Sequence, residues 1–268
     1  MFSPRGKSSK SLAIAFFVII LITSCNGVPE SRVSSSAMQQ IATNLLVNPD
    51  FEDATTWTRA CHWQGEGGAL DCVSRFQEVR PPTGWTAWWG EGIICEGGWL
   101  TGRPEFTIVT RVTDASRIYT GNQAAKQFTF YRCHLMGLAQ TVAVEAGESY
   151  VFTVYAHAWY SRCSSRPHDV PYEADCSTPI GWASDWISIG LDPMGGNDPR
   201  AASVIWSNKI TIYGRYSTRL AVTGQAEANQ MTVFIRFETT HPLKHCDGYA
   251  DTARMWKAWQ VFLPMITR

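Results

Sequence analysis

The sequence lacks the common motifs of catalysis and of nucleotide binding. It has no G-x-S-x-G elbow, no H-E-x-x-H pair and no phosphate-binding loop. The glycine-rich stretch Gly65–Gly68 is not followed by the lysine that such a loop requires. Acidic residues are present, but no motif pairs two of them for glycoside hydrolysis. We therefore expect a protein that is not an enzyme, with a glycan-active enzyme as the less favoured alternative.

An excess of charge of either sign is also missing. The 23 basic and 23 acidic side chains give a formal net charge of zero. No strong net field then favours a polyanion, so we expect no nucleic-acid partner. Cysteines spaced C-x-x-C are absent as well, and each histidine beside a cysteine lacks a second ligand pair, which disfavours a zinc site.

The apolar run near the N-terminus is too short to span a bilayer. This run, Leu12–Ile22, follows basic residues, which is the organisation of a signal peptide. It ends in Ile-Thr-Ser-Cys, which resembles the lipobox of bacterial lipoproteins. The resemblance implies a signal peptide over 1–24 and lipidation of Cys25, with an ordinary secretory signal as the alternative. We expect residues 25–43 to be a flexible tether that holds the protein outside the cytoplasm, on the bacterial membrane or cell surface.

Seven cysteines follow Cys25, which fits an oxidising compartment. Because seven is odd, at least one must stay a thiol, pair with another chain or be an incidental buried residue. Cys61 and Cys72 flank a glycine-rich stretch, whereas Cys163 and Cys176 flank a polar one. Both pairs are therefore disulfide candidates that would staple a local loop.

Segments of strand length dominate residues 44–268, which we expect to form one domain. They are rich in β-branched and aromatic residues, and long amphipathic helical patterns are lacking. The expected strands are Phe106–Val112, Lys126–Tyr131, Leu138–Val144, Tyr150–Trp159, Trp186–Leu191, Met231–Glu238 and Trp259–Met265. The turn Glu145–Glu148 is predicted to be a hairpin connection. This pattern predicts an all-β fold, a two-sheet β-sandwich of the jelly-roll kind.

Two long stretches lack strand periodicity. Trp57–Thr101 holds eight Gly, three Cys and six Trp residues, and Ser161–Asp185 is a second irregular insertion. Loops of this length are usually functional or disordered, and so many tryptophans argue against disorder. Adjacent residues of an extended segment point to opposite sides, so at least one of Trp88 and Trp89 should lie at a surface or line a groove.

Residues 44–52, Asn-Leu-Leu-Val-Asn-Pro-Asp-Phe-Glu, carry a family resemblance. They are similar to the opening strand of the jelly-roll carbohydrate-binding modules of the family 4, 9 and 22 type, which have a galactose-binding-like fold. Gln140–Val142 and Ala146–Phe152 agree with the middle of these modules, so the resemblance covers most of residues 44–268. It implies a jelly-roll fold and a carbohydrate ligand.

A second resemblance, to a subgroup of extracytoplasmic jelly-roll proteins, lies toward the C-terminus. Its motifs fall at Gly190–Gly196, Val204–Ser207 and His245–Ala253, the last with three departures from the expected residues. In the family a structural calcium ion commonly ties the first strand to the last, and the resemblance places its carboxylates at Glu52 and Asp251. Calcium takes six to eight oxygen ligands, which two carboxylates and nearby backbone carbonyls can supply. The alternative is that Glu52 makes only local contacts and Asp251 merely ends a strand.

The jelly-roll resemblance implies that the protein binds a glycan or a cell-surface polysaccharide. Sugar recognition needs flat aromatic faces and a few fixed polar groups, although a single Trp is more often buried in a core. The candidate ligand-binding residues are Trp85, Trp88, Trp89, Trp99, Trp159, Tyr160, Trp182 and Trp186. A structural or protein-interaction lipoprotein that keeps the fold without sugar binding is the alternative, and a protein partner goes with it.

Overall fold

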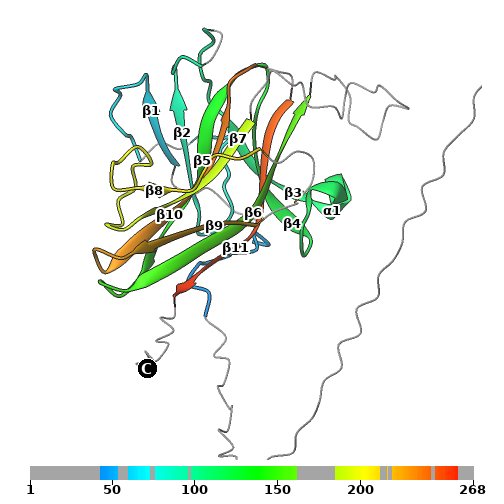
Figure 1. Ribbon diagram of the computed structural model, residues 1–268. Coiled ribbons are helices and arrows are strands. Elements are labelled where there is room, and N and C mark those ends of the chain that lie inside the picture. The colour runs from blue at the N-terminus through cyan, green and yellow to red at the C-terminus, as the bar shows by residue number, and fades with distance from the viewer. Residues whose placement is uncertain are drawn as a thin grey trace, which may run out of the picture. The chain divides into compact units, whose positions relative to one another are not determined.

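The computed structural model describes residues 43–53, 60–72, 76–95, 98–161, 185–211, 216, 219–242 and 245–258, which form two packed β-sheets (Figure 1). Sheet A consists, in spatial order, of β1 (Ala60–Gln64), β2 (Thr86–Glu91), β5 (His134–Ala143), β10 (Gln230–Thr239), β7 (Asp185–Asp192) and β8 (Ile205–Trp206). Sheet B consists of β3 (Glu105–Thr110), β4 (Gln123–Thr129), β11 (His245–Lys257), β6 (Ser149–Ser161) and β9 (Arg219–Gln225). The expected all-β, two-sheet sandwich is confirmed.

The main hydrophobic core lies between the two sheets. Alternate residues of each strand point inward, so that Trp89 and Ile235 of sheet A meet Phe106 and Phe152 of sheet B in one buried cluster. Burial of this apolar surface is the main force that holds the sheets together. The outer face of each sheet is left to the other half of the alternating residues, and these carry the candidate sites.

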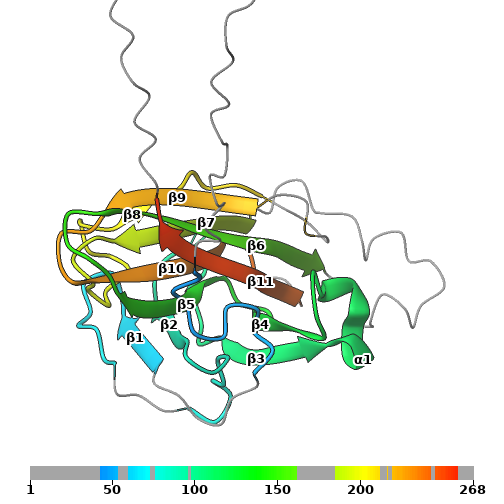
Figure 2. The same cartoon turned by 90° about the horizontal axis from the view of Figure 1, so that it is seen from below.

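The segment that resembles an opening strand is not a strand in the structure. It makes backbone bonds to β11, from Leu45 N to Met255 O at 2.9 Å and from Ala253 N to Pro49 O at 2.7 Å, and two amide side chains, Asn44 of the segment and Gln140 of β5, add to them. Asn44 donates from Nδ2 to Ala253 O at 3.1 Å and accepts from Met255 N at 2.9 Å. Gln140 bonds both the N–H and the carbonyl of Val47, at 2.7 and 2.9 Å. The segment thus lies beside β11, in the middle of sheet B (Figure 2).

The expectation that Trp57–Thr101 is one large loop region is wrong. It contains β1 and β2, which pair in parallel with Ala60 opposite Ala87, and β2 also pairs with β5. The buried alternation of Cys61 and Trp63 with Ala60 on the other face is strand-like, but the neighbouring glycines concealed it. A loop remains between the two strands.

The turn at Glu145–Glu148 exists, with Glu148 N bonded to Glu145 O at 3.2 Å, but it is not a hairpin. It joins β5 of sheet A to β6 of sheet B, and neither strand pairs with the other. Turn residues set where the chain bends, whereas the strand partner is chosen by tertiary packing.

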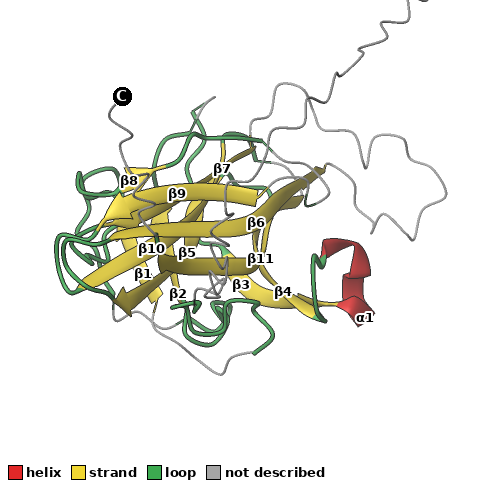
Figure 3. Ribbon diagram, turned by 60° about the horizontal axis from the view of Figure 1, so that its bottom comes forward, coloured by secondary structure: helices red, strands yellow, loops and turns green. Residues whose placement is uncertain are grey.

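A single turn of helix replaces the predicted end of one strand. The strand expected over Phe106–Val112 stops at Thr110, which caps the short helix α1 (Arg111–Asp114) through a bond from Thr113 N to its Oγ1 at 3.3 Å. A 3₁₀ turn, η1 (Ala115–Arg117), follows. Figure 3 shows α1 at the edge of the sandwich, beyond β3 and β4. Among the described residues, no helix is long and apolar enough to cross a membrane.

The other expected strands are found within a few residues of their predicted limits, and β1, β2, β8 and β9 are additions to them. The closing strand β11 covers the motif at His245–Ala253. The strand expected over Trp259–Met265 and most of the insertion between Ser161 and Asp185 lie outside the described residues.

Two disulfides lie within the described residues. Cys61–Cys72 is the predicted pair, and Cys95–Cys133 joins residues 38 positions apart, which the sequence did not reveal. Cys163, Cys176 and Cys25 lie outside the described residues. Cys246 is buried at the start of β11, with its Sγ 3.7 Å from His241 O.

Candidate functional site

Three tryptophans lie flat over three glycines on the outer face of sheet A. A Cβ atom on Gly90 would come within 2.7 Å of the Trp63 ring, and one on Gly137 within 2.5 Å of the Trp88 ring. A Cβ on Gly190 would lie 3.0 Å from the ring of Trp206. Only glycine therefore lets each indole approach the sheet so closely. We call this surface, with Trp63, Trp88 and Trp206, the tryptophan face.

Two arginines lie over these rings. The guanidinium of Arg236 is 4.0 Å from the centre of the Trp206 ring, and that of Arg200 is 4.5 Å from Trp63. Arg236 also donates from Nε to Ser188 Oγ at 2.8 Å, and burial lowers its pKa from the ordinary value. Its register places Gly137 and Ser188 on either side of Arg236 in the sheet. The face thus combines indole rings with fixed cationic donors.

Loops complete the tryptophan face. Arg200 forms an ion pair with Asp198 at 2.9 Å and donates to Gly68 O at 2.8 Å, which links the 194–204 loop to the β1–β2 loop. The disulfide of Cys61 and Cys72 holds the same loop to β1. Asn197 reaches this disulfide, with its Nδ2 3.4 Å from Cys72 Sγ.

Two hollows of about 370 Å³ each lie between these loops and the sheet, and Trp88 lines both. One has a polar wall that consists of Thr86, Thr141, Asn197, Gln230 and Thr232. The other is lined by the remaining indoles and both arginines: Trp63, Trp206, Arg200 and Arg236. Together they have the mixture of aromatic walls and a few directed polar groups that small polar ligands require.

The indole N–H of Trp88 is a buried donor without a hydrogen-bond partner among the described residues. Only 2% of this residue is exposed. A buried polar group that makes no bond costs on the order of 1–3 kcal/mol, and such groups often bind a water molecule or a ligand. The position of Trp88 between both hollows therefore makes it the centre of the candidate site.

Trp88 and Trp89 point to opposite sides of β2, as expected, but two of the predicted ligand residues are core residues. Trp89 is wholly buried between the sheets. Trp85 is buried against Phe51, at 5.0 Å between ring centres, and donates to Asn48 O at 3.1 Å. The prediction that these two present a face to a ligand is wrong, because both rings belong to the core cluster between the sheets, whereas Trp63 and Trp88 belong to a separate cluster on the outer side of sheet A.

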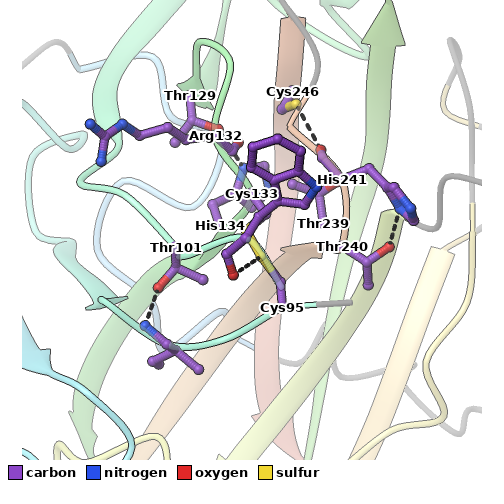
Figure 4. The surroundings of a disulfide bond; sticks show 12 residues. Cys95, Thr101, Thr129, Arg132, Cys133, His134, Thr239, Thr240, His241 and Cys246 are labelled. Carbon is purple, nitrogen blue, oxygen red and sulfur yellow. Dashed lines mark hydrogen bonds between the residues drawn. A yellow bond between two sulfur atoms is a disulfide. The ribbon is translucent and has the colours of Figure 1, made fainter. Parts of the chain in front are cut away.

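Three of the remaining predicted residues, Trp99, Trp159 and Trp186, lie in different parts of the sandwich. Trp99 is 55% exposed on the loop that the Cys95–Cys133 disulfide holds, with Cys246 and His241 beside that disulfide (Figure 4). Trp159 is half-buried on sheet B, and Trp186 is half-buried at the start of β7. Trp182 lies outside the described residues, as does the side chain of Tyr160. Of the described side chains, Trp99, Trp159 and Trp186 line neither of the two hollows that Trp88 lines.

Sequence reasoning missed Trp63, Trp206 and both arginines as site residues. Trp206 stands in the Val204–Ser207 motif. The available signal for a close approach of indole rings to the sheet was a glycine on each of three strands. That signal becomes meaningful only when the cross-strand register is known, because a glycine and its indole belong to different strands.

The two predicted calcium ligands do meet at one segment. Glu52 Oε1 accepts from Asn122 N and Gln123 N, at 2.6 and 3.1 Å. Asp251 Oδ2 accepts from Tyr119 N and Thr120 N, at 2.8 and 3.1 Å. We call this arrangement the carboxylate clamp.

The clamp fits part of a calcium site. It joins the start of the domain to its last strand, and both carboxylates contact a turn whose carbonyl groups could add ligands. However, the described residues hold no group of three or more acidic, His or Cys side chains around one point. Calcium at Glu52 and Asp251 therefore stays a prediction.

Comparison with known proteins found likenesses in structure only. No protein-family model matches the chain, and no curated protein does. Among solved structures, it is similar to the carbohydrate-binding module TmCBM61, whose structure contains β-1,4-galactotriose (12% identity, 81% of this chain, 100% of that one, TM-score 0.43). It is also similar to a putative sugar-binding protein from Bacteroides thetaiotaomicron (12% identity, 81% and 100%, TM-score 0.41). A third is the CBM22-1 xylan-binding domain from Paenibacillus barcinonensis (11% identity, 66% and 88%, TM-score 0.37). The jelly-roll carbohydrate-binding modules expected from the sequence are thus among the matches.

Proposed function

We propose that this protein is a non-catalytic lipoprotein, anchored outside the cytoplasm through Cys25, that binds a glycan on its tryptophan face. The observation that carries the proposal is the buried indole N–H of Trp88, which has no partner among the described residues and belongs to a side chain that lines two hollows. A sugar hydroxyl is a suitable acceptor for this donor. The protein then acts by equilibrium binding.

The two hollows suit different parts of a sugar chain. The polar hollow offers hydroxyl and amide groups, of which Thr141 and Thr232 already bond to each other at 2.8 Å. The second hollow offers the half-buried ring of Trp206 and the guanidinium of Arg236. Indole faces pack against the C–H side of a pyranose, while the fixed donors orient its hydroxyls.

The test is a glycan-array screen of the full chain and of three variants. Trp88→Phe keeps the aromatic ring but removes the N–H, and we expect roughly fivefold weaker binding. Trp206→Ala removes an exposed part of the wall and is expected to weaken binding roughly five- to tenfold. Trp256→Ala, a half-buried Trp on β11, is the matched control and should bind normally. Unchanged binding by the first two variants would refute the placement of the site.

A second candidate function, binding to a protein partner, is favoured by one observation. Ile94, Trp99 and Leu100 are 67%, 55% and 55% exposed on a single disulfide-held loop. Exposed apolar side chains in a fixed loop are typical of protein contacts. If the folded chain bound no glycan on the array, this candidate would replace the first.

Calcium at the carboxylate clamp belongs to the same proposal as a stabilising ion. Glu52 and Asp251 would hold it, and its role would be to fasten the start of the domain to β11. It would take no part in ligand contacts.

A further inference from the structure

Arg236 brings a positive charge to the tryptophan face, and no carboxylate of the described residues pairs with it. The side chain is half-buried and lines the same hollow as Trp63, Trp88 and Trp206. Its printed partner is Ser188, a neutral hydroxyl, and the ion pairs of the described residues do not include it. A cation that is partly removed from water without a counter-charge is costly. An anion placed beside it would therefore be favoured.

The neighbouring charges do not neutralise Arg236. Arg200 already makes two bonds to the Asp198 carboxylate, each 2.9 Å long. Glu238 lies two residues farther along β10, but its carboxylate is 2.6 Å from the Lys209 ammonium. Burial, the larger influence, lowers the pKa of Arg236, and Glu238 raises it. Among the described residues no Asp or Glu lines either hollow, so the charge that the hollows present to a ligand is positive.

The guanidinium of Arg236 is held in place in a way that leaves donors for a ligand. Its centre is 4.0 Å from the centre of the Trp206 ring, which occupies one face of the planar group. Its Nε donates to the hydroxyl of Ser188, the residue opposite Arg236 on β7. No described residue accepts from the two terminal nitrogens. Because a carboxylate pairs with the edge of a guanidinium, stacking on Trp206 and pairing with a ligand are compatible.

The surroundings of Arg236 suit a sugar ring that carries its own carboxylate. The hollow has a volume of about 370 Å³, and its walls include the indoles of Trp88 and Trp206. The Trp88 N–H has no acceptor among the described residues. In a uronic acid the carboxylate is attached directly to the pyranose ring. One such unit can therefore pack a C–H face on an indole, accept from Trp88 through a hydroxyl, and reach Arg236 with its carboxylate.

We infer that the tryptophan face takes an acidic saccharide, in which the carboxylate of a uronate unit pairs with the Arg236 guanidinium. This inference rests on the proposed function and narrows its ligand from glycans in general to those that carry a carboxylate. The zero net charge of the chain does not oppose it. Salt screens exposed charges beyond about 8 Å at physiological ionic strength, so the local charge of the hollow decides.

The test is NMR titration of the detergent-purified full chain with pairs of probes that differ in one group. Each pair is the methyl β-pyranoside of galactose or glucose and the corresponding methyl uronoside, in which a carboxylate replaces the hydroxymethyl group. We expect the uronoside to bind at least roughly tenfold more tightly than its neutral twin, with a preference that falls as salt is added. A further probe, methyl β-galactopyranoside 6-sulfate, carries the negative charge on a tetrahedral group.

Two variants locate the source of the preference. Arg236→Gln removes the cation and should abolish the preference for uronosides while the neutral probes still bind. Arg219→Gln is the matched control, because it removes an exposed arginine from β9 of sheet B and should leave the preference unchanged. Circular dichroism checks that both variants fold. The comparison of charged and neutral probes on the native chain needs no variant, so it tests the inference even if Arg236→Gln does not fold.

The outcomes separate this inference from the proposed function. A preference for uronosides that is lost in Arg236→Gln and kept in Arg219→Gln supports the uronate assignment. Neutral probes that bind as tightly as uronosides, or a preference that survives Arg236→Gln, would overturn it and leave glycan binding intact. Tighter binding of the 6-sulfate than of the uronoside would overturn the carboxylate in favour of a sulfate ester. If no probe binds, the uronate assignment is wrong, and the glycan array decides whether the proposed function stands.

Discussion

Replacing Gly137 by alanine should disrupt the tryptophan face from below. The added Cβ would lie 1.8 Å from Ile235 O on β10 and 2.5 Å from the Trp88 ring, so the strand or the indole must move. Overpacking of a well-packed site costs roughly 1–3 kcal/mol, and contact with a backbone carbonyl places this change at the upper end. For a domain of this size, about 3 kcal/mol corresponds to a fall in melting temperature of roughly 6–12 °C.

Gly67→Ala is the matched control, because a Cβ at Gly67 would meet nothing within 4 Å. It should change the free energy of unfolding by less than about 1 kcal/mol. The assay is thermal unfolding followed by circular dichroism, with glycan binding measured on the same samples. If Gly137→Ala melts like Gly67→Ala, then Trp88 does not lie flat over β5 and the floor of both hollows is misplaced.

Three further predictions concern the scaffold. Burial raises the pKa of Asp251 from 3.8 to about 6, so between these pH values the calcium-free folded state binds more protons than the unfolded state. The free energy of unfolding should therefore fall by on the order of 2 kcal/mol as the pH rises from about 4 to 6. A free energy of unfolding that does not change over this pH range would contradict the prediction. Calcium should raise the melting temperature of the native chain but not that of the Glu52→Gln variant. If the native chain melted at the same temperature in calcium and in EDTA, calcium binding at the carboxylate clamp would be refuted. Serine at both Cys95 and Cys133 should lower the free energy of unfolding by about 3–4 kcal/mol in chemical denaturation, given the 38-residue separation, and an unchanged midpoint would contradict the bridge.

The strands that the sequence predicted correctly are those whose own residues carry the signal. β5, β6, β7 and β10 contain runs of apolar and β-branched residues, and burial of one side of each gave the pattern. β1 and β2 lacked this signal because glycine and cysteine surround them. β2 has the sequence Thr-Ala-Trp-Trp-Gly-Glu. Its Gly90 leaves room for the ring of Trp63 and adds no side chain to a strand pattern.

The site was less predictable than the fold because it depends on pairs of residues from different strands. That at least one of Trp88 and Trp89 lies at a surface or lines a groove followed from their adjacency, but which of the two it would be did not. That the face with Trp88 also receives Trp63, Trp206 and Arg236 depends on the sheet order, which no local pattern encodes. The carboxylates Glu52 and Asp251 were brought together by a family resemblance, not by spacing.

The most direct test of the account is NMR of the indole N–H groups in ¹⁵N-tryptophan-labelled protein during titration with a glycan identified on the array. Trp85 provides an internal standard, because its N–H is already bonded to Asn48 O, whereas that of Trp88 has no partner among the described residues. The account predicts that the Trp88 signal shifts in step with saturation while the Trp85 signal stays in place. A glycan that saturates the protein without moving the Trp88 signal would contradict the proposal that the tryptophan face is the binding site.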